Sequence, residues 1–112
     1  MKKKYKHYHT FVVPTANKSP YLETCLQSLK KQTVKSKIII TTAKPFNGIK
    51  DIAKKYNAKL IIFKNHKNIA NDWNRAINKS DSNYVTLAHQ DDIYDKNYNY
   101  EIQKSLKIYN KK

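Results

Sequence analysis

Short apolar runs alternate with amphipathic segments along this chain, and this alternation constrains the fold more than any other feature. Four runs have the length and residue types of buried β-strands, at residues 10–13, 37–42, 60–63 and 84–88. We expect Pro14 to halt the first strand. Between these runs, and after the last, apolar residues recur at helical spacings. The sequence therefore predicts an α/β fold with an open parallel sheet of about four strands.

The predicted helices begin at turn or capping residues. The first should start with Ser19 as N-cap and Pro20 in its first turn. The second follows a turn of Pro, Asn and Gly, the third follows Asn68, and the last begins near Asn97. Their apolar faces are Leu22, Cys25, Leu26 and Leu29; Ile49, Ile52, Ala53 and Tyr56; Ile69, Trp73, Ala76 and Ile77; and Tyr98, Ile102, Leu106 and Tyr109.

The length and charge narrow the classes of function. The 112 residues suit a basic lead-in at 1–9 and a single domain at 10–112. The net charge of +15 would suggest a nucleic acid or an anionic membrane as partner. Arg75 is the only arginine, however, and base readout favours guanidinium groups, so we expect no specific nucleic acid. Lys, Asn, Ile and Tyr make up about half the chain, and A/T-only codons can encode all four. We therefore interpret the charge mainly as compositional bias.

The cysteine content and hydropathy bear on location. Cys25 is the single cysteine, so the chain can form no internal disulfide, and its apolar neighbours predict a reduced, buried thiol. No apolar run approaches the roughly 20 residues of a membrane span. We expect a cytoplasmic location, with the lysines leaving open a peripheral association with the inner face of the membrane.

The residues that follow the predicted strands are the candidates for chemistry. Ligands of open parallel sheets bind beyond the carboxyl ends of strands where the strand order reverses, which directs attention to residues 14–19 and 89–94. Asp91 and Asp92 are adjacent carboxylates after the fourth strand, and a divalent cation on a diphosphate needs one or two such ligands. The alternative is that they cap a following turn. The single glycine, Gly48, excludes a glycine-rich phosphate loop.

Two landmarks of the sequence occur together in a known family. The first is FVVPTAN at residues 11–17, followed by an apolar helix and by QT at 32–33. The second is Asn74, followed by a strand that ends in HQDD at 89–92. In combination, over about residues 10–100, they resemble family 2 glycosyltransferases, which have the GT-A nucleotide-sugar fold.

The resemblance implies a function. It implies transfer of a sugar from a nucleoside diphosphate donor, assisted by Mn²⁺ or Mg²⁺, to a glycan or lipid-linked acceptor in surface glycan synthesis. Asp91, together with Asp92, would hold the metal. The residues that would line the donor side are Pro14, Thr15, Asn17, Thr42, Asn74, His89 and Gln90.

Several positions depart from the family pattern. His89 occupies the place of the first aspartate of the metal motif, Ala16 replaces an aromatic residue, and Thr42 stands where many members carry an aspartate. Trp73 is interpreted as a core residue, with a platform that stacks on a sugar as the alternative. The tyrosines near the end are interpreted as packing for the last helix, with an acceptor-binding role as the alternative; they are Tyr94, Tyr98 and Tyr100.

Members of this family normally continue well beyond this length and supply a catalytic base there, for which residues after Tyr94 offer no obvious candidate. We therefore expect this chain to be the donor-binding half of a truncated or split enzyme. Two alternatives remain open: a non-catalytic nucleotide-sugar binding fragment, and a basic α/β protein that binds nucleic acid or anionic lipid through its lysines.

Overall fold

The computed structural model describes residues 7–15, 19–63, 74–75, 77–78, 82–102 and 104. Within them the chain alternates strands with helices: β1 (His7–Thr15), α1 (Leu22–Lys30), β2 (Lys37–Thr42), α2 (Ile49–Lys55), β3 (Lys59–Ile62) and β4 (Ser82–Leu87). The strands form one sheet in the order β3-β2-β1-β4, and every pairing is parallel. The predicted α/β fold with a four-stranded parallel sheet is confirmed.

The strand order reverses between β1 and β4. Val12 of β1 pairs with Ile39 of β2 on one side and with Leu87 of β4 on the other. The chain proceeds from β1 outward to β2 and β3, and then crosses to the far side of β1 to form β4. The carboxyl ends of β1 and β4 therefore lie next to each other at the reversal point where open α/β sheets bind ligands.

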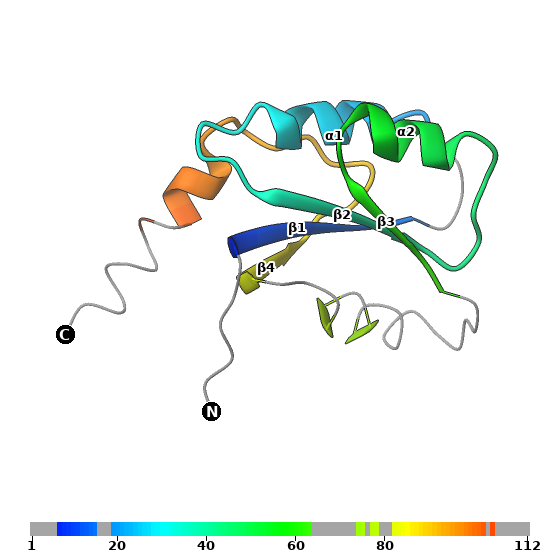
Figure 1. Ribbon diagram of the computed structural model, residues 1–112. Helices are drawn as coiled ribbons and strands as arrows, with labels where there is room; N and C mark the ends of the chain where they lie inside the picture. Colours follow the sequence, from blue (N-terminus) through cyan, green and yellow to red (C-terminus); the bar gives the residue numbers. More distant parts are fainter. Residues whose placement is uncertain are drawn as a thin grey trace.

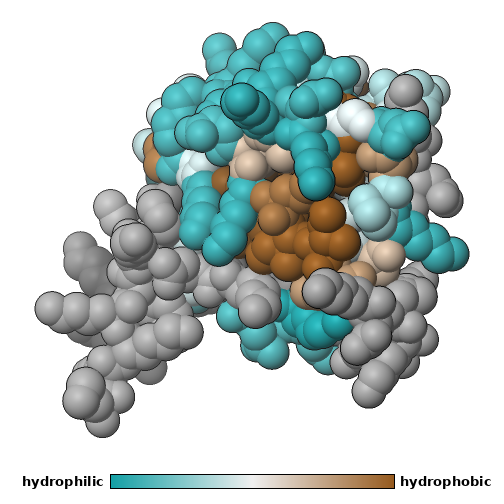
Figure 2. Space-filling view, turned by 45° about the vertical axis from the view of Figure 1, so that its right-hand side comes forward, coloured by the Kyte–Doolittle hydropathy of each residue, from teal (hydrophilic) through white to brown (hydrophobic). Residues whose placement is uncertain are grey.

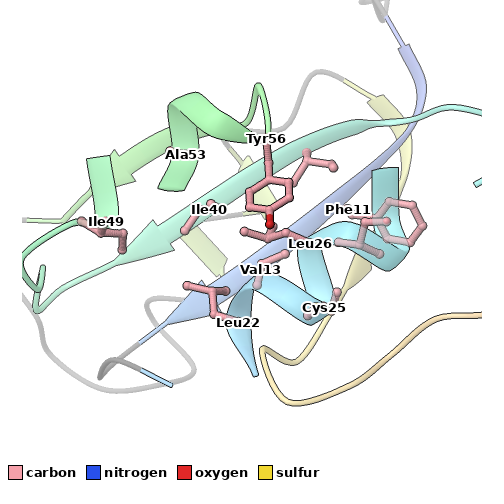
Figure 3. Close-up of a cluster of buried hydrophobic side chains, with 12 residues drawn as sticks. Phe11, Val13, Leu22, Cys25, Leu26, Ile40, Ile49, Ala53 and Tyr56 are labelled. Atoms are coloured by element: carbon pink, nitrogen blue, oxygen red, sulfur yellow. The ribbon is translucent and has the colours of Figure 1, made fainter. Parts of the chain in front are cut away.

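Both α1 and α2 cover the same face of the sheet (Figure 1). The main hydrophobic core lies between these helices and the strands, as Figure 3 shows for side chains of β1, β2, α1 and α2. Phe11, Val13 and Ile40 reach it from the strands and are fully buried. The helices add Leu22, Cys25, Leu26 and Leu29 from α1, and Ile49 and Ala53 from α2.

A second, smaller cluster lies on the opposite face of the sheet. Its buried members are Val12, Ile39 and Phe63, and the guanidinium carbon of Arg75 lies 4.2 Å from the centre of the Phe63 ring. Figure 2 shows hydrophilic residues over the helix layer and a patch of hydrophobic residues below it. The helix layer thus buries the apolar stripes and exposes the charged faces, as the amphipathic pattern predicts.

Strand β1 is longer than predicted at both ends. It begins at His7, ahead of the expected Thr10, and it runs through Pro14 to Thr15. The carbonyl of Val12 points toward β4, where it accepts the Ala88 N–H. Backbone polar groups two residues apart in a strand point to the same side, so the nitrogen of Pro14 also faces β4. The register with β4 ends at Val12, so the missing N–H of Pro14 removes no ladder hydrogen bond. The prediction that Pro14 halts the strand was wrong.

The start of α1 also differs from the prediction. The helix begins at Leu22, and its N-cap position, Tyr21, makes no capping hydrogen bond through its side chain. Ser19 lies in the preceding turn, where its carbonyl accepts the N–H of Leu22. Ser19 is therefore not the N-cap, and Pro20 is not in the first turn. Gly48 precedes α2 with a φ of +92°, a left-handed conformation that glycine adopts without strain.

The remaining boundaries agree with the prediction to within two residues. The third strand is shifted by one residue, and the fourth begins two residues early at Ser82. Residues 98–102 are helical, as expected for the last helix, and so are 74–75 and 77–78. The predicted cap Asn68 and the core residues Ile69, Trp73 and Ala76 lie outside the described residues. No helix in the described part of the chain is long and apolar enough to cross a membrane.

Candidate functional site

The segments that follow β1 and β4 meet at the reversal point of the sheet. The backbone N–H of Ala88 donates to the carbonyl of Val12 over 2.7 Å, which brings the end of β4 against β1. Beyond the strands, the hydroxyl of Ser19 donates to Oδ1 of Asp91 over 2.8 Å. The same Ser19 oxygen accepts the N–H of Tyr21 over 3.1 Å. Ser19 therefore links the carboxylate of Asp91 to the chain that enters α1.

Residues 89–92 form a turn that lies against α1. The N–H of Asp92 donates to the carbonyl of His89 over 3.0 Å. That carbonyl also accepts the Cys25 thiol of α1 over 3.5 Å. The side chains of His89, Asp91 and Asp92 are exposed, so the turn presents two adjacent carboxylates to solvent.

The negative charges of the two aspartates affect the pKa values of two nearby side chains, those of Cys25 and Tyr94. Burial raises the pKa of the Cys25 thiol to about 11, and the negative charges of Asp92 and Asp91 add to the effect. Burial and the charge of Asp92 also raise the pKa of the Tyr94 phenol. Cys25 is thus a neutral thiol at pH 7, which excludes a nucleophilic thiolate at this site.

The exposed carboxylates fit a hard divalent cation. Such ions take oxygen ligands, and one bound to a diphosphate needs only one or two carboxylates. No group of three or more His, Cys, Asp or Glu side chains gathers for a metal among the described residues, and Asp91 and Asp92 are two adjacent exposed carboxylates on this turn. Between them and His89, the side-chain oxygen of Gln90 is buried and accepts no hydrogen bond within the described residues. This unpaired acceptor lies on the same turn as the candidate cation ligands.

Three other predicted site residues lie at the same edge of the sheet. Pro14 is half-buried, and the buried hydroxyl of Thr15 donates to the carbonyl of Thr41 over 3.1 Å. Thr42 is paired in register with Thr15, and its buried hydroxyl accepts the N–H of Lys44 over 3.1 Å. The side chains of Thr15 and Thr42 are therefore engaged with backbone groups of β2 and of the turn that follows it.

The last two predicted donor residues, Asn17 and Asn74, have no described contact with the turn at 89–92. Asn17 lies outside the described residues. Asn74 is helical and exposed, and its neighbour Arg75 lies over the Phe63 ring on the face of the sheet opposite α1. The described contacts thus join Ser19 to Asp91 and place His89 on the same turn as Asp91, and the roles of all the predicted site residues stay predictions.

The interpretation of the tyrosines as packing residues is confirmed for two of them. The ring centres of Tyr94 and Tyr98 lie 6.0 and 5.9 Å from that of Phe11 and 4.9 Å from each other. Tyr100 is 46% exposed.

Sequence reasoning assigned no role at this site to Ser19, Ser28 or Gln32, of which Gln32 belongs to the QT landmark. Ser28 accepts the N–H of Tyr94, and Gln32 binds the backbone of Asp95 and Asn99. Their signal in the sequence is polar character at helical spacing from the apolar residue Cys25.

The sequence matches the family model described as Glycosyl transferase family 2 over residues 10–111. The chain belongs to glycosyl transferase family 2. No curated protein matches this glycosyltransferase-family chain.

Solved structures share the fold of this family 2 chain. A crystal structure of S. aureus TarS superposes with a TM-score of 0.79 at 19% identity, over 90% of this chain and 20% of that one. The mannosyltransferase PcManGT from Pyrobaculum calidifontis, in complex with GDP-Man and Mn²⁺, superposes with a TM-score of 0.68 at 18% identity, over 82% of this chain and 30% of that one. The fold is therefore that of GT-A glycosyltransferases, and this family 2 chain spans less than a third of either neighbour.

Proposed function

We propose that this chain binds a nucleoside diphosphate sugar, the donor for glycosyl transfer, at the carboxyl ends of β1 and β4. The observation that carries the proposal is the pair of exposed carboxylates on the turn after β4, one of which is hydrogen-bonded to Ser19 ahead of α1. Membership of glycosyl transferase family 2 supports the reaction class. The GT-A neighbour in complex with GDP-Man and Mn²⁺ supports the choice of ligands.

In this proposal each residue of the site has a defined task. Asp91 and Asp92 hold Mn²⁺ or Mg²⁺, which when bound neutralises the charge of the departing diphosphate. Ser19 orients the Asp91 carboxylate, and the amino end of α1 adds partial positive charge beside the phosphates. The nucleoside side of the pocket is formed by Pro14, Thr15, Asn17 and Thr42, with Asn74, His89 and Gln90 toward the diphosphate and sugar.

The proposal gives this chain the donor side of the reaction. Transfer with inversion requires a base that accepts the proton of the attacking hydroxyl. We propose that this base and the binding site for a glycan or lipid-linked acceptor belong to a further part of the enzyme, so that residues 10–112 form its donor-binding half. The enzyme would act in surface glycan synthesis in the cytoplasm, at the inner face of the membrane.

Substitution of Asp91 tests the donor site. Calorimetric titration of UDP and of GDP into the wild-type chain, with Mn²⁺ and with EDTA, should show tighter binding of at least one nucleotide with the metal. Asp91→Asn keeps an oxygen that can accept the Ser19 hydroxyl but removes the charge, so it should weaken metal-dependent binding by roughly 10- to 100-fold. The control Glu101→Gln removes an exposed carboxylate from the last helical segment, away from the reversal point, and should bind as the wild type does.

Equal affinity of the wild type and Asp91→Asn, with and without Mn²⁺, would refute the donor site. Affinity for DNA or anionic vesicles that collapses with salt and is unchanged in Asp91→Asn would instead support a basic binding protein. Metal-dependent nucleotide binding in a full-length enzyme that neither transfers nor hydrolyses the sugar would support a non-catalytic binding module.

A further inference from the structure

Helix α1 carries a row of buried polar groups along the side that faces away from α2. Cys25, Ser28 and Gln32 follow one another at spacings of three and four, and they are 0%, 7% and 1% exposed. Gln32 lies just beyond the last residue of the helix. Buried polar side chains require hydrogen-bond partners, and these three find theirs in residues 89–99, the segment that follows β4. Figure 1 shows this segment, coloured yellow to orange, running alongside α1.

Ser28 holds the middle of this segment. Its oxygen accepts the N–H of Tyr94 over 3.0 Å, while its own hydroxyl donates to the carbonyl of Cys25 over 2.7 Å. Both hydrogen-bonding functions of the hydroxyl are therefore used. Cys25 itself donates to the carbonyl of His89, one turn of α1 closer to the aspartates.

Gln32 holds the same segment at two points. Its amide nitrogen donates to the carbonyl of Asp95 over 2.6 Å, and its amide oxygen accepts the N–H of Asn99 over 2.8 Å. Asn99 is fully buried, and its side chain donates to the carbonyl of Val34 over 2.8 Å and to the hydroxyl of Ser36. The far end of the segment is thereby fixed to the loop that enters β2.

These contacts stand in for the regular backbone hydrogen bonds of a helix or strand, which the segment lacks. Residues 91–97 contain no helix or strand. Their backbone groups find partners within the segment, in the N–H of Thr33, which donates to the carbonyl of Lys96 over 2.8 Å, and in the side chains of Ser28 and Gln32. At the other end of this segment, Asp91 and Asp92 are exposed, adjacent and both negative, and their repulsion favours separation. A turn that holds two like charges in one place needs a rigid support.

We propose that Ser28 and Gln32 are positioning residues that hold Asp91 and Asp92 in the arrangement that binds the metal and diphosphate. This inference rests on the proposed donor site and extends it to two side chains of the α1 segment that point at the backbone of residues 94–99. They act through the backbone of the turn and touch no ligand. Supports of this kind typically change metal affinity by 10- to 100-fold when they are removed.

The test compares two glutamines that differ in what they contact. Gln32→Met keeps the length of the side chain and removes its three hydrogen bonds, two to the segment and one to the carbonyl of Ser28 over 3.2 Å. Gln27→Met is the matched control, because Gln27 lies on the exposed side of α1 and donates to the Tyr56 hydroxyl over 3.3 Å, away from the segment. All proteins are studied at a temperature where circular dichroism shows them folded.

We expect Gln32→Met to weaken Mn²⁺-dependent binding of UDP or GDP by about tenfold, with the affinity in EDTA unchanged. Gln27→Met should bind as the wild type does. Ser28→Ala should act like Gln32→Met, whereas Ser28→Thr retains a hydroxyl and should restore most of the affinity. Wild-type metal dependence in Gln32→Met, or an equal loss in Gln27→Met, would overturn the inference.

Hydrogen–deuterium exchange separates this inference from the proposed function. The amides of Asp92 and Tyr94 should exchange faster in Gln32→Met than in the wild type, and at the wild-type rate in Gln27→Met. If the wild type shows no metal-dependent nucleotide binding, the proposed function fails. The exchange rates still decide whether Gln32 orders the turn, and unchanged rates would overturn the positioning role.

Discussion

Among single residues, His9 makes the stability of the fold depend on pH. Its ring is 3% exposed, and both nitrogens are hydrogen-bonded to hydroxyls, Nδ1 to Ser36 over 2.9 Å and Nε2 to Thr86 over 2.7 Å. The ring also meets the edge of Phe11 with centres 4.6 Å apart. No carboxylate is among these partners to stabilise a charged imidazolium. Burial accordingly lowers the pKa of His9 from 6.5 to about 4.

This shift predicts a stability that falls in mild acid. Between the folded pKa of about 4 and the unfolded value of 6.5, the unfolded chain binds the extra proton, so the contribution of His9 is complete above pH 6.5 and is lost as the pH falls toward 4. The loss should amount to about 3 kcal/mol in the free energy of unfolding. Urea unfolding at a series of pH values, compared with His9→Gln, measures it. Parallel pH profiles for the two proteins would contradict the prediction.

At the scale of elements, α1 serves both the core and the site. Leu26 is fully buried on its apolar stripe, and its truncation leaves a cavity between helix and sheet. Leu26→Ala should lower the free energy of unfolding by about 2–5 kcal/mol. Lys30→Ala, on the exposed side of the same helix, should change it by less than about 0.5 kcal/mol. Urea unfolding with unchanged m-values would establish both effects, and similar losses for the two variants would contradict the assigned faces.

Some features of the elements follow from neighbouring residues in the sequence, and others depend on residues far away in the chain. The bounds of β2 are those that its run of isoleucines predicts, because consecutive β-branched residues suit a strand covered on both faces. Pro14 was misread because its effect depends on where β4 stops pairing with β1, which is a property of the sheet. Ser19 was misread because its hydroxyl binds Asp91, 72 residues later in the chain. Such a contact leaves no mark in the residues around Ser19.

At the scale of the whole molecule, the alternation of strands and helices predicted the fold class, and the rule for open sheets indicated both segments at the reversal point. The strand order itself follows from long-range packing and was not predicted. The support given by Ser28 and Gln32 was also missed, because their partners are backbone groups of an irregular segment. Polar character at helical spacing marks the two residues, but backbone groups are the same at every residue, so the sequence does not identify their partners.

The net charge of the molecule predicts how its stability depends on salt. With a net charge of +15, repulsion among lysines opposes the compact state, and exposed ion pairs such as Lys55 with Glu23, 2.9 Å apart, offset little of it. Raising sodium chloride from low ionic strength to physiological levels should therefore increase the free energy of unfolding by about 1 kcal/mol. Unfolding by urea, an uncharged denaturant, at pH 7.5 measures this without interference from histidine titration. A stability that is constant or falls over this range would show that the lysines are spaced too widely to repel, and would favour local pairing with acidic side chains as the controlling effect.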